Sequence, residues 1–181
     1  MPKSLEFFKE GMKHFDEIGT FFETSKFVSK KVTSQISPEQ KIIVELGAGN
    51  GNVTIEILKK MNYKQKLYSF EINKNFCKIL REIKDARLKV INDSAYNFPK
   101  YVKNPDYVIS ILPIFDKTKD EKERFFEMVR KSLDENGKFF QFQYFPSAYP
   151  LVKEKFSDNE LHFCFLNFPP GFLYGGIKCG L

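Results

Sequence analysis

Residues Val44–Gly51 (VELGAGNG) decide the fold of this chain. They close a short apolar run, Lys41–Leu46, and precede a stretch with helical spacing, Val53–Met61. Glycines at alternate positions let the backbone turn tightly and approach a ligand, while the first turn of the following helix offers free N–H groups. The segment therefore predicts a strand, a glycine loop and a helix that together form a nucleotide-type site.

The glycine spacing argues against a dinucleotide site. Such a site reads G-x-G-x-x-G, and counted from Gly47 its third glycine falls on Asn52. The segment fits E-x-G-x-G-x-G better, with Glu45 as its acid. A second acid, Glu71, ends the next apolar run, where a carboxylate can accept both hydroxyls of a ribose. A third, Asp93 in Asn92–Ala95 (NDSA), is suited to the exocyclic amine of an adenine.

Strands and helices alternate beyond the glycine loop. One helix is predicted after Asn73, which can serve as its N-cap. Another is predicted to start at Asp120, with Glu123 completing a capping-box-like pattern, and to end at Asn136-Gly137. Further strands are predicted at Leu67–Glu71, Arg87–Ile91, Asp106–Leu112 and Lys138–Phe145. A short helix follows around residues 148–156. This β-α-β repetition predicts a parallel sheet with helices on both faces, whose strand ends line one crevice.

The last two predicted strands, Leu161–Phe168 and Phe172–Cys179, flank Pro169-Pro170-Gly171. So short a turn requires them to be antiparallel. The expected fold class is therefore α/β, with a Rossmann-like, seven-stranded, mostly parallel sheet whose last strand is antiparallel.

Two extra helices are expected before the sheet. The first carries one apolar stripe, and the second spans about Ser25–Ile36 and ends at Ser37-Pro38. The stripe comprises Leu5, Phe8, Met12, Phe15, Ile18 and Phe22. It either lies on a bilayer or packs against the sheet. We assign residues 1–38 to an N-terminal helical cap and membrane-contact segment and residues 39–181 to the main domain, in one compact domain overall.

Composition narrows the class of protein. The chain has 181 residues, of which 42% are hydrophobic and 29% charged, and 21 are Phe, so we expect one globular domain. It has neither a run long enough to span a membrane nor a signal peptide, and we expect an intracellular, cytoplasmic monomer. Its three cysteines form no C-x-x-C pair, so no metal site is expected.

Charge is concentrated in one region. The net charge is +6, yet Lys59–Lys103 contains 12 basic and 4 acidic residues, a local charge of +8. Such asymmetry favours nucleic acid or an anionic membrane as partner, although an ordinary solubilising face has the same pattern.

The four motifs VELGAGNG, FEIN, NDSA and DYVISILP, in this order, resemble those of class I S-adenosylmethionine-dependent methyltransferases over about Lys41–Phe145. The resemblance implies an enzyme of EC class 2.1.1 with S-adenosyl-L-methionine as cofactor. The methionine part would lie on Glu45, Gly47, Ala48, Gly49, Asn50 and Gly51, the ribose on Glu71 with Ile72 beside it, and the adenine on Asp93 and Ser94.

Two groups within this class share the N-terminal arrangement, the rRNA adenine dimethylases and the bacterial phospholipid N-methyltransferases. Adenine enzymes carry N-[LI]-P-[YF] or D-P-P-Y after the fourth strand, where this chain has Ile111–Ile114 (ILPI). The polar group and the ring are both missing, so base methylation is disfavoured and nucleic acid is not expected as a partner.

Three segments, Ser110–Pro113, Phe140–Tyr144 and Asn167–Pro170, resemble the phospholipid N-methyltransferases. That family reads Pro-Ser-Ser before the second helix, where this chain has Glu23–Ser25, so the head-group preference stays open. The implied reaction is stepwise methylation of an amino-phospholipid, phosphatidylethanolamine towards phosphatidylcholine, with ornithine lipids or another amine as further possible acceptors. The number of methyl transfers is also open.

The acceptor residues are chosen from their place in the predicted sheet and from the chemistry of the step. Catalytic roles fall on Tyr144 and Ser110, and substrate contacts on Phe22, Leu112, Pro113 and Phe168. Tyr144 ends the fifth strand and is the first candidate to contact the nitrogen, because the step needs orientation more than a strong base. Aromatic faces can also hold the methylated head group, which is a fixed cation.

The preferred interpretation is a peripheral enzyme on the inner face of the membrane. The N-terminal helix and the Lys59–Lys103 region would contact anionic lipid. Three alternatives stay open: an rRNA adenine methyltransferase, a small-molecule N-methyltransferase, and a non-catalytic S-adenosylmethionine-binding module.

Overall fold

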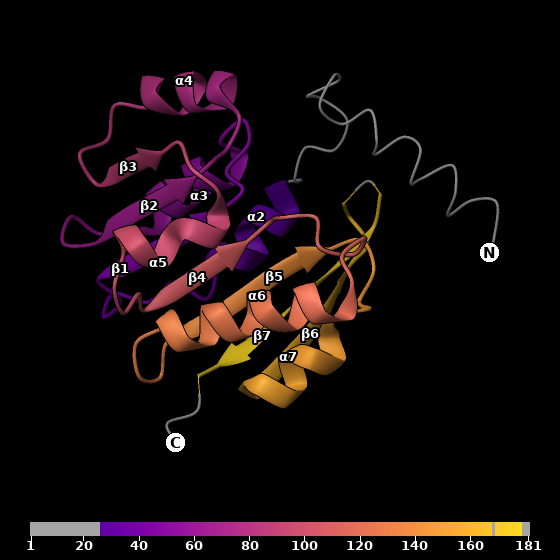
Figure 1. Ribbon diagram of the computed structural model, residues 1–181. Helices are drawn as coiled ribbons and strands as arrows, with labels where there is room; N and C mark the ends of the chain where they lie inside the picture. The colour runs from indigo at the N-terminus through magenta and orange to yellow at the C-terminus, as the bar shows by residue number, and fades with distance from the viewer. Residues whose placement is uncertain (1–25, 168, 179–181) are drawn as a thin grey trace.

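The computed structural model describes residues 26–167 and 169–178. These residues form one seven-stranded sheet in the order β3-β2-β1-β4-β5-β7-β6 (Figure 1). The strands are β1 (Ile42–Leu46), β2 (Lys66–Phe70), β3 (Leu88–Ile91), β4 (Tyr107–Ser110), β5 (Lys138–Gln143), β6 (Ser157–Cys164) and β7 (Gly171–Ile177). Strands β1 to β5 are parallel, and β7 runs antiparallel to both β5 and β6. The predicted sheet with its antiparallel last strand is confirmed.

Helices cover both faces of the sheet. They are α2 (Lys26–Thr33), α3 (Asn52–Lys60), α4 (Lys74–Glu82), α5 (Phe98–Tyr101), α6 (Lys119–Ser132) and α7 (Tyr149–Lys155), with a 3-10 turn η1 at Ala95–Asn97. One core packs α2 and α3 on the sheet through buried Val28, Val32 and Ile57. The other packs α5, α6 and α7 on it, and there Phe125 and Phe126 meet Phe139 with ring centroids 6.3 and 5.8 Å away.

The register aligns the carboxyl ends of the parallel strands. Leu46 at the end of β1 lies between Phe70 of β2 and Ser110 of β4. On either side, Phe70 pairs with Ile91 and Ser110 pairs with Gln141. Loops that follow these strands therefore meet at one edge of the sheet, where ligands bind in folds of this kind.

Helix α6 begins at a different cap from the one predicted. Its N-cap is Thr118, whose hydroxyl accepts a hydrogen bond from the Glu121 N–H, while the Glu121 carboxylate accepts from the Thr118 N–H at 2.8 Å. The prediction of Asp120 with Glu123 was wrong, because Thr118 has the extended backbone of a cap and Asp120 already lies in the first turn. The helix ends at Ser132, before the predicted Asn136-Gly137.

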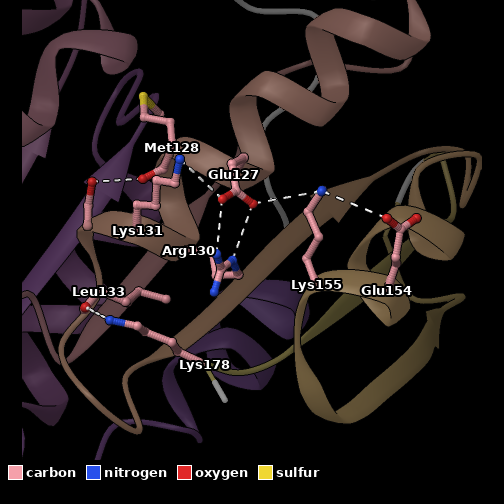
Figure 2. A network of polar contacts seen from close by, with 9 residues as sticks. Glu127, Met128, Arg130, Lys131, Leu133, Glu154, Lys155 and Lys178 are labelled. Atoms are coloured by element: carbon pink, nitrogen blue, oxygen red, sulfur yellow. Dashed lines mark hydrogen bonds and ion pairs between the residues drawn. The ribbon is translucent and has the colours of Figure 1, made fainter. Parts of the chain in front are cut away.

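A polar network joins α6 to α7 (Figure 2). Glu127 accepts two hydrogen bonds from Arg130, and its other charged neighbours are Lys131 and Lys155, the latter on α7 at 3.8 Å. The Arg130 hydrogen bonds lower the pKa of Glu127 to about 2. At the end of α6, Lys178 donates to the Leu133 carbonyl, a favourable position for a cation because it lies near a helix C-terminus.

Of the two helices predicted before the sheet, the structure describes the second. Helix α2 packs on the sheet and accepts at its Val32 carbonyl a hydrogen bond of 2.9 Å from the buried Tyr107 hydroxyl. The apolar stripe predicted from Leu5 to Phe22 lies outside the described residues. The role of residues 1–38 as a membrane-contact segment thus stays a prediction. Within residues 26–167 and 169–178, no helix is long and apolar enough to cross a membrane.

Candidate active site

The glycine loop turns at the end of β1 in a conformation that glycine allows. Gly47, Gly49 and Gly51 have φ angles of +82°, +54° and +92°. The Gly47 and Ala48 N–H groups donate to the Phe70 carbonyl of β2, and Gly51 donates to Ala48, which fixes the path of the loop. A Cβ on Gly49 would meet no atom within 4 Å, so the backbone there is open to a ligand.

Glu71 and the glycine loop are in direct contact. One carboxylate oxygen of Glu71 accepts a hydrogen bond of 2.8 Å from the Gly49 N–H, and the other accepts one of 2.7 Å from the Asn73 N–H. Asn92, which follows β3, donates to the carbonyls of Glu71 and Ile72. Hydrogen bonds thus join the loops that follow β1, β2 and β3.

Glu45 is fully buried beneath the loop. Its Oε2 accepts hydrogen bonds from Thr54 of α3 at 2.7 Å and Ser69 of β2 at 2.6 Å. Its Oε1 has no partner among the described residues. Burial, together with a smaller effect of the nearby Glu71 charge, raises the pKa of Glu45 to about 7 against the two hydroxyl hydrogen bonds.

Asp93 lies after β3 and is hydrogen bonded by residues of η1 and α5, which follow it in the chain. Its carboxylate accepts from the Ser94 N–H, from Asn97 at 2.9 Å and from the Tyr101 hydroxyl at 2.7 Å. These hydrogen bonds, with that from Tyr101 the strongest, lower the pKa of Asp93. Ser94 caps η1 by accepting from the Tyr96 N–H.

The turn after β4 is held by two glutamines of β5. Buried Gln141 and Gln143 both donate to the Leu112 carbonyl, and the Gln143 side-chain oxygen accepts from the Ile114 N–H at 3.0 Å. Leu112 also closes over the glycine loop, since a Cβ on Gly47 would stand 2.8 Å from its Cδ2. The turn therefore joins the glycine loop to β5.

Ser110 and Pro113 differ in exposure. Ser110 is fully buried, and its hydroxyl accepts from the Leu112 N–H at 3.4 Å, whereas Pro113 is exposed. Ser110 therefore supports the turn from the protein interior, whereas Pro113 lies on the solvent side of the turn.

Tyr144 follows β5 beside the turn between β6 and β7. Burial raises its pKa to about 12, and a hydrogen bond with the Asn167 side chain opposes that shift. Asn167 is 2% exposed and donates to the Pro169 carbonyl at 2.7 Å. Phe142 packs edge-on against Tyr144 with ring centroids 5.6 Å apart. Phe22 and Phe168, the other predicted aromatic contacts, lie outside the described residues.

The residues at this edge fit S-adenosylmethionine. The open backbone at Gly49 would admit the methionine chain, and the unpartnered Glu45 oxygen is a buried acceptor near the loop. The Glu71 carboxylate suits a ribose. Ile72 beside it is 72% exposed, which leaves an apolar surface for a flat ring between Glu71 and Asp93. No group of three metal-ligating side chains occurs in the described part of the chain.

Comparison with known proteins agrees with this fold. The precorrin-6y C5,15-methyltransferase of Geobacter metallireducens superposes with a TM-score of 0.71 at 14% identity, over 89% of this chain and 92% of that one. The fold and the site together define a class I S-adenosylmethionine-dependent methyltransferase. Within that class, residues 13–138 match the family Ribosomal RNA adenine dimethylase, and the chain belongs to this family.

Two curated relatives of this chain are named for different acceptors. The ornithine lipid N-methyltransferase of Singulisphaera acidiphila is 27% identical over 178 residues, 92% of each chain. The rRNA adenine N-6-methyltransferase of Lysinibacillus sphaericus is 30% identical over 95 residues. That match spans 51% of this chain and only 38% of the relative, so the chain corresponds to well under half of the rRNA enzyme.

Several residues of the site escaped prediction. Gln141, Gln143 and Asn167 stand within motifs that the sequence analysis quoted, but no role was given to them. A signal existed for the first two, because polar residues two apart in an otherwise apolar strand lie on the same face and need partners when buried. No comparable signal marks Tyr101, whose pairing with Asp93 depends on the fold of η1 and α5.

Proposed function

We propose that this methyltransferase transfers methyl groups to the amine head group of a membrane lipid, with phosphatidylethanolamine and ornithine lipid as the acceptors to be compared. The observation that carries the proposal is the turn after β4. Its polar backbone groups are bound by Gln141 and Gln143, and its side chains Leu112, Pro113 and Ile114 are apolar. The two positions that hold a polar group and a stacking ring in adenine N6 enzymes are occupied here by Ile111 and Ile114.

Bound S-adenosylmethionine would supply an electrophilic methyl group. The residues of the chain have to orient an amine in its neutral, nucleophilic form. With a pKa of about 12, the Tyr144 hydroxyl stays protonated at neutral pH, so it orients the nitrogen by hydrogen bonding and does not remove its proton. Ser110 acts through the Leu112 backbone as a positioning residue, because its side chain is fully buried.

The ring of Tyr144 also suits the later, cationic products. Half-buried Tyr144 packs edge-on against buried Phe142 at the end of β5, and its ring face can stabilise a methylated ammonium by about 0.5–2 kcal/mol. The match to the ornithine lipid enzyme, over 92% of each chain, supports the same class of acceptor.

Methylation of rRNA adenine is the second candidate, favoured by the family to which the chain belongs. The basic region supports it as well, since 11 of its 12 Lys and Arg residues are exposed. The two candidates differ in acceptor chemistry and can be tested in one assay.

The test is methyl transfer from labelled S-adenosylmethionine to a panel of phosphatidylethanolamine vesicles, ornithine lipid vesicles and protein-free rRNA. We expect label in lipid and none in rRNA. Label found in rRNA alone would refute the proposal. A sample without protein serves as the negative control for label that is carried over without catalysis, and Glu71→Gln should transfer less label than the wild type.

A further inference from the structure

The turn between β6 and β7 exposes apolar side chains beside the acceptor site. Phe163, Phe165 and Leu166 are 58%, 63% and 56% exposed, and Leu161 on the same strand is 43% exposed. We call residues 161–166 the apolar tip. Because β7 is antiparallel to both β5 and β6, this tip lies at the same edge of the sheet as the end of β5 (Figure 1).

Apolar side chains occur on both faces of the tip. Phe163 pairs with Phe172 in the register, and their ring centroids lie 5.2 Å apart. Phe165 instead approaches Phe27 at the start of α2, with a centroid distance of 6.3 Å. A wedge that is apolar on two faces suits insertion into a soft medium better than packing against one flat surface.

The charges around the tip fit an anionic lipid surface. From Leu161 to Pro170 the sequence contains no Lys, Arg, Asp or Glu, and His162 within this segment is hydrogen bonded with Glu160, the residue just before the segment. Lys30 lies one turn beyond Phe27 on α2 and is exposed. Burial raises the pKa of the Cys164 thiol and the charge of Lys31 opposes the shift, which locates Lys31 near the tip. Exposed apolar side chains with lysines beside them are typical of interfacial membrane segments.

The tip is continuous with the acceptor site. Asn167, the residue after Leu166, is buried and hydrogen bonded with Tyr144. The segment that exposes Phe165 and Leu166 thus also places Asn167 against the proposed amine-orienting hydroxyl.

We infer that the apolar tip inserts into the bilayer interface and docks the enzyme on the membrane with Tyr144 facing the head groups, an inference that rests on the proposed lipid acceptor. The Lys59–Lys103 region lies mainly along β2, α4 and β3, at the opposite end of the strand order. Docking by the tip and docking by the basic region are therefore separable.

A single introduced tryptophan can report insertion, because the chain has none of its own. The Phe165→Trp variant is compared with Tyr63→Trp, since Tyr63 lies between α3 and β2 and is 81% exposed. On addition of phosphatidylglycerol vesicles, we expect the indole emission of Phe165→Trp to shift to the blue and to be quenched by brominated acyl chains. Neither change is expected for Tyr63→Trp. Indole emission that stays unquenched in vesicle-bound Phe165→Trp would overturn the inference. A blue shift that appears without vesicles when the protein concentration is raised would also overturn it, because the tip would then bind a second copy of the protein.

Vesicle affinity gives a second readout. Phe165→Ser with Leu166→Ser should reduce binding about 10-fold or more, and Tyr63→Ser by less than about twofold. Thermal melting confirms that each variant folds. A larger loss from Lys74→Glu with Lys78→Glu than from the tip variant would assign docking to the basic region and overturn the inference.

The vesicles contain no amine, so insertion is measured independently of the acceptor. Methyl transfer is measured separately on amino-lipid dispersed in detergent, where we expect the tip variant to retain wild-type activity. Insertion without any lipid methylation would refute the proposed function alone, and methylation without insertion would refute the docking surface alone.

Discussion

The proposed cofactor half of the molecule, β3-β2-β1-β4 with the loops after them, differs sharply from the proposed acceptor half, β5-β7-β6. In the cofactor half the carboxylates already have hydrogen-bond partners: Glu71 with Gly49, Glu45 with Thr54 and Ser69, and Asp93 with Tyr101. In the acceptor half, aromatic and aliphatic side chains dominate the site, and part of them is exposed. A preorganised polar site lowers the cost of binding one defined ligand, whereas an exposed apolar surface suits a partner without fixed shape.

The halves meet at Leu112. It closes over Gly47 on one side, and its carbonyl is bound by Gln141 and Gln143 on the other. Substitutions should therefore affect one half selectively unless they move Leu112.

The largest effect is expected from Gly47→Ala. Alanine at a φ of +82° costs about 1–2 kcal/mol, and its Cβ would displace Leu112 at a further cost of about 1–3 kcal/mol. Calorimetry and kinetics should show cofactor affinity reduced about 100-fold together with a raised KM for the acceptor. Gly49→Ala is the matched control, since it has the strain without the contact, and it should leave the acceptor KM unchanged. Equal effects of both variants on that KM would show that Leu112 does not couple the halves.

The second largest effect is expected from Glu45, through the dependence of the free energy of unfolding on pH. The folded-state pKa of Glu45 is raised from 4.5 to about 7, so the unfolded chain ionises this group first. The free energy of unfolding should fall by up to about 3 kcal/mol as pH rises from about 4.5 to 7 and level off above it. Urea unfolding at several pH values should show a weaker decline for Glu45→Gln. Identical profiles would remove Glu45 as the cause.

Glu71→Gln should weaken cofactor binding by about 1–3 kcal/mol, because a charge-assisted acceptor becomes a neutral one. Titration calorimetry measures this directly, and the acceptor KM should not change. Glu56→Gln, which alters only a surface pair with Lys59, is the control. Cofactor affinity that is unaffected by Glu71→Gln would exclude this carboxylate from the site.

Tyr144→Phe should act on the acceptor half alone. Loss of one orienting hydrogen bond of about 1–1.5 kcal/mol predicts a decrease of about 10-fold in kcat/KM for the amine at unchanged cofactor affinity. Tyr144→Leu should further impair methylation of already methylated lipid, since it removes a ring face. A fall in cofactor affinity for Tyr144→Phe would contradict the division into halves.

The smallest effect is expected from Glu127→Gln, away from the ligand edge. Because the pKa of Glu127 is lowered to about 2, its contribution is present above about pH 4.5 and is lost as pH falls towards 2. Partial exposure limits the loss of unfolding free energy at pH 7 to about 0.5–1 kcal/mol. The variant and the wild type should converge near pH 2, and both should methylate equally at pH 7.

The two halves also differ in how far the sequence predicts them. Glu45 lies near the end of an apolar run in a β-α-β pattern, and Glu71 and Asp93 each follow one. Parallel strands place their carboxyl ends at one edge. Their proximity was therefore predictable. Their partners were not, since Thr54, Ser69 and Tyr101 reach them only through the packing of α3, β2 and α5.

The acceptor half was predicted less completely. The run Leu161–Phe168 indicates a strand, but apolar composition alone does not show that β6 is at the edge of the sheet with Phe163 exposed. The bond between Asn167 and Tyr144 likewise joins residues far apart in the sequence. Roles of the cofactor residues named from the motifs, and of Phe22 and Phe168, stay predictions.

Mass spectrometry of total lipid and rRNA from cells that express the protein tests the central claim most directly. We predict methylated derivatives of an amino-lipid that are reduced with Glu71→Gln and with Tyr144→Phe, and unchanged rRNA adenine. An unaltered lipid profile together with newly methylated rRNA adenine would contradict the assignment of a lipid acceptor.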